Sequence, residues 1–325
     1  MHRSVSPDAE AAPNTPELRA SGSAGFVIAP VVLGFDIGAR RLARMVLPLW
    51  RRSLSLTEAM AGVKIDLPPL PDGVQGYKLR AVPDDEAQTW LANPQFRPWV
   101  RQRYGRCYTD LTLGFDRWFG GLSASTRQGL RRKARRLAEQ GGGAIDVRCY
   151  RTAEEMAHFF AMARKISSIS YQERLLSAGL PADSLAEMQT LAAADAVRGF
   201  LLFVHDRPVA YLYAPAAGDV LLYAHLGYDP AMADLSPGSV LQLEAFRLLM
   251  AERRFAWFDF TEGGGQHKHS FASGSIPSLD VLLLRPTLSN RARLGALTGF
   301  DGAVAMAKRA TERLGIGGVR KLLRR

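Results

Sequence analysis

Three side chains in the second half of the chain have the chemistry of proton transfer. His225 lies in an apolar segment where strand alternation puts it on one face with Tyr223 and Gly227, and a neutral imidazole can accept a proton near pH 7. Asp259 and Glu262 stand where another apolar segment gives way to a Gly-rich loop, a common location for functional carboxylates. Each also has a structural explanation, a hydrogen-bonded histidine or a carboxylate that caps its own loop.

Lys268 and Tyr171 extend this set of candidates. The Lys268 ammonium could stabilise an oxyanion or a phosphate, and Tyr171 could donate a proton or line a pocket. A solvated lysine and a packed tyrosine are the ordinary alternatives. His267 and His269 flank Lys268 and would face the same way on an extended strand, but a third ligand is not evident and the lysine charge opposes a cation. We therefore expect no metal site.

A strand-to-helix junction at 227–239 is the candidate phosphate site. Three short segments rich in β-formers precede it, at 199–205, 208–214 and 219–228, and their polar turns predict an antiparallel meander. Ser236 is the predicted N-cap of the helix that follows, and Pro237 lies in the first turn of that helix. The unpaired amides of such a helix start can approach a phosphate. The predicted cofactor-binding residues are Ser236, Pro237, Gly238, Ser239 and Val240.

A strongly cationic helix is predicted over 125–140, ending at three consecutive glycines. One face is apolar, and the other faces carry six cations without an intervening carboxylate. Such cations repel one another unless an anion neutralises them, so the face is either simply solvated or an anion-binding surface. The six are Arg127, Arg131, Arg132, Lys133, Arg135 and Arg136.

Composition agrees with an anionic partner. The 325 residues carry a formal net charge of +11, and 47% of them are hydrophobic, enough for a sizeable core. The two cysteines do not make a disulfide framework and fit a reducing compartment. The first apolar run, 26–35, follows a polar leader and contains Pro30, so it predicts neither a secretory signal nor a membrane span. We expect a cytoplasmic protein.

Both ends of the chain differ from its middle. Residues 1–25 have the composition of a disordered leader. Residues 39–50 alternate arginines with apolar residues, which predicts either a surface helix broken at Pro48 or a segment lying in a membrane interface. The segment from Arg285 to the end of the sequence contains ten Lys and Arg residues but two acidic ones, and residues 303–314 are predicted to form an amphipathic helix. Basic ends favour an anionic membrane surface over nucleic acid, because the aromatic residues of a single-strand binder are missing there.

The order of these elements resembles the GNAT acyltransferase fold. Five motifs in sequence resemble, more narrowly, the branch that includes CelD-like and BioF2-like domains, relatives of the Fem-type peptidyltransferases. The resemblance covers roughly 104–285 and implies an α/β (α+β) fold with a mixed, mainly antiparallel sheet flanked by helices. The motifs are Ser125–Arg136, Tyr171-Gln172, Asp206–Ala210, Gly227–Gly238 and Asp259–Lys268.

The resemblance also implies an activity, the transfer of an acyl group from a thioester carrier, usually acyl-CoA, to an amine. Ser236 to Ser239 would then face the cofactor pyrophosphate, and Lys268 matches the lysine of a terminal Tyr-Lys motif in which His267 replaces the tyrosine. The predicted organisation is a leader (1–25), a basic amphipathic segment with a small α/β extension (26–103), the acyltransferase domain (104–285) and a basic helical tail (286–325).

The predicted function is N-acylation of an amine on an envelope- or membrane-associated substrate, for example a lipid long-chain base or an amino sugar. The predicted location is cytoplasmic, with the inner membrane face as the candidate peripheral site. One alternative is a Fem-like peptidyltransferase that uses aminoacyl-tRNA. Another is a catalytically degenerate, membrane-associated scaffold.

Overall fold

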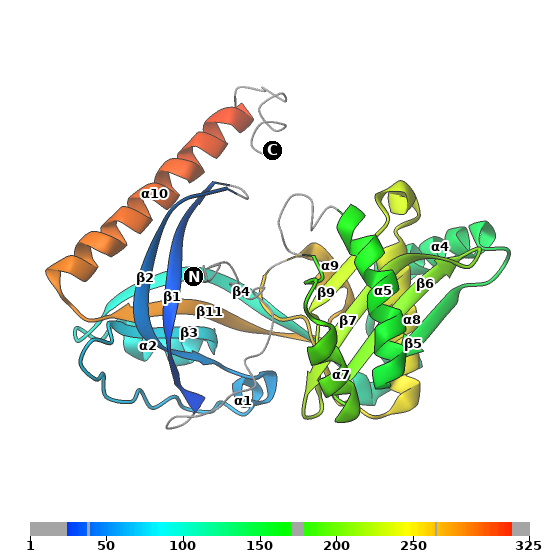
Figure 1. Ribbon diagram of the computed structural model, residues 1–325, viewed down its shortest axis with the longest axis horizontal. Coiled ribbons are helices and arrows are strands. Elements are labelled where there is room, and N and C mark those ends of the chain that lie inside the picture. Colours follow the sequence, from blue (N-terminus) through cyan, green and yellow to red (C-terminus); the bar gives the residue numbers. More distant parts are fainter. Residues whose placement is uncertain (1–24, 38–39, 171–178, 264, 314–325) are drawn as a thin grey trace, which may run out of the picture.

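The computed structural model describes residues 25–37, 40–170, 179–263 and 265–313. Two lobes share one eleven-stranded sheet of order β1-β2-β3-β11-β4-β10-β8-β7-β6-β5, with β9 paired to β7 (Figure 1). Only β2–β3 and β10–β8 are parallel pairs among those described. The predicted mixed, mainly antiparallel sheet flanked by helices is confirmed.

The N-terminal lobe is built on a long ribbon and three further strands. Its elements are β1 (Val27–Ile37), β2 (Arg40–Ser53), α1 (Leu56–Met60), β3 (Gly76–Pro83), α2 (Asp84–Leu91), β4 (Arg97–Asp110), β11 (Gly274–Leu284) and α10 (Leu288–Arg313). The surface helix predicted over residues 39–50 is wrong, because this segment is strand β2. Leu47 and Leu49 are buried while Val46 and Pro48 are exposed, the period of two that a strand requires.

The second lobe packs helices on both faces of its strands. Its elements are η2 (Leu111–Leu113), α3 (Phe115–Gly121), α4 (Ala124–Gln140), β5 (Asp146–Tyr150), α5 (Ala153–Ile169), α7 (Leu185–Ala193), β6 (Val197–Val204), β7 (Arg207–Ala217), β8 (Val220–Leu222), β9 (His225–Tyr228), η3 (Pro230–Leu235), α8 (Pro237–Glu252), β10 (Trp257–Asp259) and α9 (Gln266–Phe271). Helices α5 and α7 cover one face, and α4 and α8 cover the other (Figure 1).

Local signals explain where the helices next to the site begin and end. The Ser123 hydroxyl accepts the Thr126 amide at 3.2 Å and starts α4, which ends at Gly141. Thr152 and Glu155 form a capping box at the start of α5. The helix predicted over 125–140 is confirmed by α4.

The segment 261–273, predicted as a Gly-rich loop, instead contains α9. His267 and His269 therefore lie on a helix and not on an extended strand, and residues two apart on a helix point in different directions. The His269 ring lies against Cys107, with Nδ1 3.3 Å from Sγ. The geometric reason for pairing the two histidines is thus removed.

The domain boundaries remain predictions, and the one placed at residue 103 falls inside β4. This strand pairs with β11 from Arg97 to Tyr108 and with β10 at its end, so it belongs to both lobes. Residues 1–24 of the predicted leader and 314–325 of the predicted basic tail lie outside the described residues. None of the described helices is both long and apolar enough to cross a membrane.

Candidate active site

Strands β8 and β10 run together for three residues and then part. Leu222 lies opposite Asp259, and the Tyr223 amide still donates to the Asp259 carbonyl at 2.8 Å. Beyond this point the chain after β10 turns to β4, where the Phe260 amide donates to the Cys107 carbonyl at 3.0 Å. Within the described part of the chain, β9 pairs with β7 alone, so the sheet is split between β9 and β10.

A β-bulge lies where the split opens. Tyr213 pairs with His225, and Ala216 pairs with Leu221. Between these two pairs the chain from β8 to β9 has three residues (222–224), whereas β7 has two (214–215). The Ala224 amide also donates to the Tyr213 carbonyl, at 3.3 Å. The extra residue reverses the alternation of side chains.

The bulge corrects the expectation that Tyr223, His225 and Gly227 share one face. Tyr223 packs with the α4/α8 core, whereas Ala224 belongs to the α5/α7 core. The His225 ring stacks on Tyr213, also in the α5/α7 core, with centroids 6.2 Å apart and planes 19° from parallel. Tyr223 and His225 therefore point to opposite faces of the sheet at the split.

The outer edge of β9 can accept an extended ligand. The Asp229 amide donates to Val209 at 2.8 Å, which makes Asp229–Val209 a hydrogen-bonded pair. Because such pairs alternate along antiparallel strands, the backbone groups of Leu226 and Tyr228 point away from β7 and into the split. They form a short row of donors and acceptors that leads toward the start of α8.

Helix α8 begins differently from the prediction. Ser236 has the left-handed conformation (φ 53°, ψ 50°), and its side chain does not cap the helix, so the predicted N-cap role is wrong. Its carbonyl instead accepts the Ser239 and Val240 amides at 3.0 and 3.3 Å. Pro237 has no amide proton, so the Gly238 amide is the first-turn donor without an acceptor inside the helix. Pro237, Gly238 and Val240 are buried, and Ser239 lines the pocket between α4, α8 and α9.

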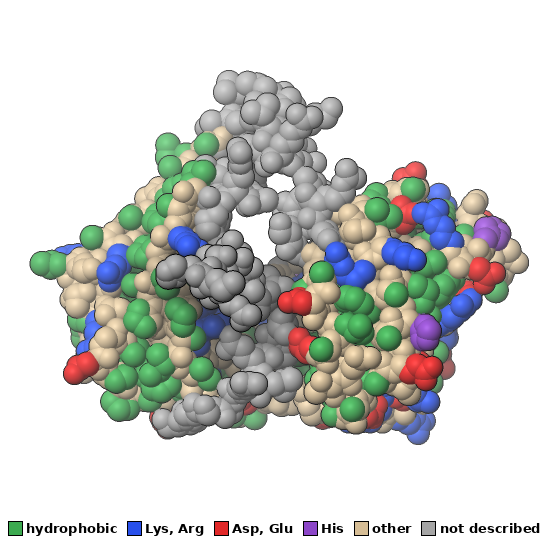
Figure 2. Space-filling view, in the orientation of Figure 1, with side chains coloured by type: hydrophobic (Ala, Val, Ile, Leu, Met, Phe, Trp, Pro, Cys, Tyr) green, Lys and Arg blue, Asp and Glu red, His purple; other side chains and the backbone are tan. Residues whose placement is uncertain are grey.

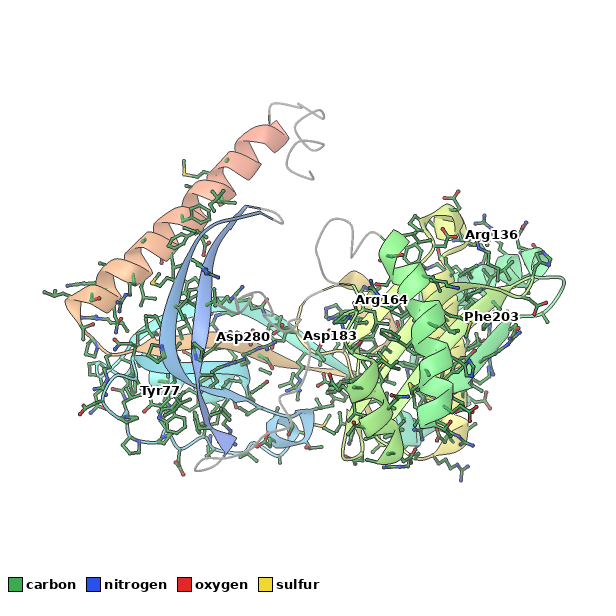
Figure 3. The ribbon with its side chains drawn as sticks, in the orientation of Figure 1. Tyr77, Arg136, Arg164, Asp183, Phe203 and Asp280 are labelled. Atoms are coloured by element: carbon green, nitrogen blue, oxygen red, sulfur yellow. The ribbon has the colours of Figure 1, made fainter. Side chains whose placement is uncertain are left out.

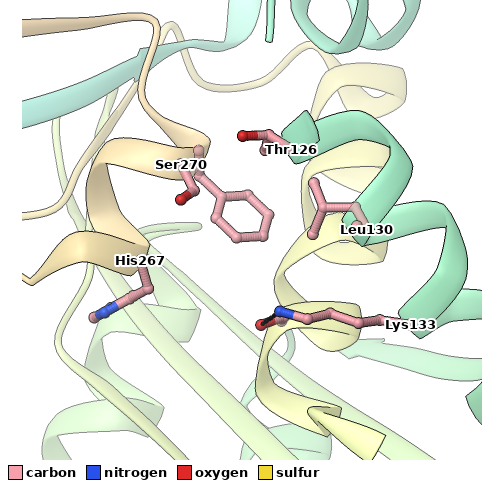
Figure 4. A pocket seen from close by; sticks show the side chains of 8 residues that line it. Thr126, Leu130, Lys133, His267 and Ser270 are labelled. Carbon is pink, nitrogen blue, oxygen red and sulfur yellow. Dashed lines mark hydrogen bonds between the residues drawn. The ribbon is translucent and has the colours of Figure 1, made fainter. Parts of the chain in front are cut away.

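That pocket has a volume of about 270 Å³ and lies between α4, α8 and α9 (Figure 4). Lys133 of α4 reaches across to α8, with Nζ 3.3 Å from Ser239 Oγ. One cation of the predicted basic helix is thus placed beside the start of α8. The lining residues are Thr126, Gly129, Leu130, Lys133, Ser239, His267, Ser270 and Phe271.

His267 connects the pocket to the split. Its Nε2 lies 3.5 Å from the hydroxyl of Tyr223. Desolvation by its neighbours, and then the positive charge of Lys268, lower the pKa of His267, so the ring is neutral at pH 7. Burial raises the pKa of Tyr223, whose hydroxyl therefore stays protonated. The pair can donate a hydrogen bond at the point where the split opens.

Lys268 holds the loop that follows β10. Its Nζ donates to the carbonyls of Phe260 at 2.8 Å and Glu262 at 2.5 Å. Burial lowers the pKa of Lys268, opposed by the charges of Asp259, Cys107 and Glu262. The ammonium thus serves the backbone of this loop, and its predicted role toward an oxyanion or phosphate remains a prediction.

Asp259 is fully buried and already engaged. Both of its carboxylate oxygens contact Arg106, with Oδ2 2.5 Å from Nη2, and Oδ1 accepts the Thr261 amide at 2.8 Å. The Arg106 guanidinium also donates to the Leu54 carbonyl of the N-terminal lobe at 2.9 Å. These contacts are those of a structural ion pair at the junction of the lobes.

Glu262 lies in a second polar cluster at that junction. Its carboxylate is 2.5 Å from Arg80 and neighbours Asp280. Asp280 belongs to β11 and is labelled in Figure 3. Asp280 accepts hydrogen bonds from the Ala81 amide at 2.9 Å and the Tyr104 hydroxyl at 3.2 Å. Burial raises the pKa of Glu262, and the charge of Arg80 only partly offsets this effect. Glu262 is therefore the predicted carboxylate whose pKa moves toward neutrality.

The structure brings together part of the predicted set. Tyr171 lies outside the described residues. His225 and Lys268 border the split from different sides, while Asp259 and Glu262 bind arginines behind it. Tyr223 and His267 were not among the predicted site residues. Lys133 was predicted only as one of six cations of a candidate anion-binding surface, and their helical spacing does not single it out. Among the described residues, three or more His, Cys, Asp or Glu side chains do not gather in a metal-binding geometry anywhere.

Residues 124–269 match the family described as "Acetyltransferase (GNAT) domain". The matched segment therefore has a GNAT-like fold. It includes α4, the bulged strand, the start of α8 and the pocket-lining residues other than Ser270 and Phe271. No curated protein matches the chain.

Several solved structures are similar to the chain at low identity. FemX is 13% identical, over 84% of this chain and 93% of that one, with a TM-score of 0.49. The C-terminal domain of a putative lysylphosphatidylglycerol synthetase from Agrobacterium fabrum is 9% identical, over 79% and 84%, with a TM-score of 0.48. L-PGS from Bacillus licheniformis is 13% identical, over 67% and 71%, with a TM-score of 0.43.

Proposed function

We propose that the GNAT domain transfers an acyl group from acyl-CoA to an amine on a membrane- or envelope-associated substrate. The observation that carries the proposal is the split between β9 and β10, whose open edge leads to the start of α8. A thioester carrier has the matching chemistry, an extended arm with two amides followed by a phosphate.

The residues along the split fit such a carrier in order. The backbone groups of Leu226 and Tyr228 would pair with the amides of the pantetheine arm, as an added strand pairs with a sheet edge. Ser239 and Lys133, which line the pocket at the start of α8, would hold the diphosphate. Gly238 lets the helix start lie close to β9, because a Cβ there would be 2.9 Å from Leu226 Cδ2.

The chemical step needs a base on one side of the thioester and a hydrogen-bond donor for the developing charge. The amine nitrogen attacks the carbonyl carbon, the new C–N bond forms, the C–S bond breaks, and the thiolate leaves. His225 on the α5/α7 side is the proposed acceptor of the amine proton. Tyr223, backed by His267, is the proposed hydrogen-bond donor on the other side.

The acceptor class follows from charge and from the sequence resemblance. An amine attached to a lipid, such as a long-chain base, would be presented at an anionic membrane surface, and a chain of net charge +11 is attracted there. An amino sugar of an envelope polysaccharide is the other acceptor we propose to test.

Titration calorimetry with CoA tests the site. We expect the parent protein to bind CoA and Lys133→Ala to bind it about tenfold more weakly, the usual cost of losing a charged contact to phosphate. Arg132→Ala, an exposed cation on the same helix, is the matched control and should bind normally.

A second assay measures free-thiol release from acyl-CoA in the presence of sphingoid bases and amino sugars. The absence of CoA binding would overturn the proposal, and co-purification of RNA together with transfer from aminoacyl-tRNA would replace it by the peptidyltransferase function.

A further inference from the structure

The β1–β2 ribbon (27–37 and 40–53) exposes an apolar strip. Three of its large apolar side chains are strongly exposed: Ile28 (45%), Leu42 (61%) and Val46 (51%). The register places Val32 opposite Val46, and it places the strands' two prolines, at 30 and 48, opposite each other. The strip therefore runs along one face of both strands.

The opposite face of the ribbon is fully used by the core. Leu33, Leu47 and Leu49 are buried against Leu294 and Leu297 of α10. Helix α10 thus backs the ribbon on that side (Figure 1). The apolar strip is therefore on the side of the ribbon that faces away from the core. Its side chains are exposed although the core-facing side is well packed.

An exposed arginine of β2 lies beside the strip. Leu42 is the extra residue of a β-bulge, because Phe35 pairs with Ala43 while Asp36 pairs with Arg41. Arg44 is exposed on the strand beside it, and the sequence of β2 contains five arginines and no carboxylate. Figure 2 shows hydrophobic and basic side chains, with few acidic ones, on this face of the N-terminal lobe.

We propose that this strip docks the protein on an anionic lipid bilayer. Exposed apolar side chains next to arginines match the interfacial region of such a bilayer, where alkyl groups enter the headgroup layer and arginines meet lipid phosphates. Pairing with a second copy through the free edge is disfavoured, because Pro30 lies in the edge strand β1. The inference rests on the proposed function only in assigning the acceptor to the same membrane.

Vesicle co-sedimentation without CoA or acceptor tests the docking surface separately from catalysis. The full chain is mixed with vesicles of phosphatidylcholine alone or with one third phosphatidylglycerol. We expect binding to the anionic vesicles, at least about tenfold weaker for Leu42→Ser/Val46→Ser and for Arg44→Glu. The controls are Val63→Ser and Arg97→Glu, exposed positions of the same lobe outside the ribbon, which should bind like the parent.

Two results would overturn the proposal. The first is that the parent does not bind the vesicles, or that the ribbon variants and the control variants weaken binding equally. The other is a dimer in solution that the double variant dissociates, which would make the strip a protein interface. Unchanged CoA affinity in all variants keeps this outcome distinct from failure of the proposed transferase function.

Discussion

Asp259 has a structural role, although a carboxylate at this place in the sequence could equally have had a catalytic one. A carboxylate at the end of a strand, before a Gly-rich loop, is an equally good signal for catalysis and for a loop cap. Its partner Arg106 is far away in sequence, so the sequence could not distinguish the two. With no exposed surface and three donors around it, the carboxylate holds β10, the following loop and β4 together.

We therefore expect Asp259→Ala to cost stability. The substitution leaves the Arg106 charge buried without its partner, which typically costs about 3–5 kcal/mol. Urea unfolding followed by circular dichroism measures the change. Glu244→Ala breaks an exposed pair with Arg247 and should cost under about 1 kcal/mol. A loss for Asp259→Ala no larger than that of the control would contradict the structural role.

The raised pKa of Glu262 gives a pH dependence of defined sign. Between its unfolded pKa and the higher folded pKa, the folded state binds more protons, so the contribution of Glu262 to stability falls as pH rises through that window. Glu262→Gln removes the titration. The free energy of unfolding of the parent minus that of the variant should therefore decrease from pH 4.5 upward.

This difference is measured by chemical unfolding at intervals between pH 4 and 8. Glu154→Gln, which replaces an exposed carboxylate on α5, is the matched control for the substitution itself. Parallel stability curves for the parent and Glu262→Gln would show that burial does not raise this pKa.

At the scale of elements, the broken third strand of the meander decides how the site is arranged. A regular strand from 219 to 228 would place Tyr223 and His225 on one face. The single extra residue at Ala224 puts them on opposite faces and coincides with the parting of β8 from β10.

Deletion of Ala224 tests this arrangement. A regular register moves Tyr223 away from His267 and closes the split, so we expect CoA affinity to fall at least about tenfold with the far-ultraviolet circular dichroism unchanged. Deletion of Gly142 in the exposed turn after α4 is the matched control and should keep the affinity. Normal CoA binding by the Ala224 deletion would mean that the bulge is dispensable.

At the scale of the whole molecule, the two lobes are joined by shared strands and not by a linker. Strand β11 pairs with β3 on one side and with β4 on the other, and β4 continues to β10. Arg106 and Glu262 add polar contacts across the same junction. The lobes should therefore unfold together.

A fragment of residues 104–285 should not fold stably on its own. It lacks β3 and the first part of β4, so Leu279 and Leu283, now fully buried, would face water at about 1.5–3 kcal/mol each. That loss is comparable with the whole stability of a typical domain. Calorimetry should give one transition for the full chain and a strongly lowered or absent one for the fragment; equal melting temperatures would show independent domains.

Local signals in the sequence were enough for most elements of the second lobe. Helix α4 follows from its apolar period and terminal glycines, α5 from Thr152 and Glu155, and the meander from its alternating segments and turns. The helix predicted over 39–50 failed because three arginines among apolar residues fit a helix and a half-exposed strand almost equally well. Only the partners, β1 and α10, decide between them.

The sequence by itself determined the meander, the helix that starts at Pro237 and the basic character of α4, because these depend on neighbours within a few residues. The fold family was implied by the resemblance of its motifs to GNAT domains. Only the tertiary structure decided which cation reaches the pocket and which carboxylates form ion pairs with arginines. It also decided to which face of the sheet the rings of Tyr223 and His225 point. Those outcomes depend on contacts between residues up to about two hundred positions apart, such as Ala81 with Asp280, and on one inserted residue that reverses a strand's faces.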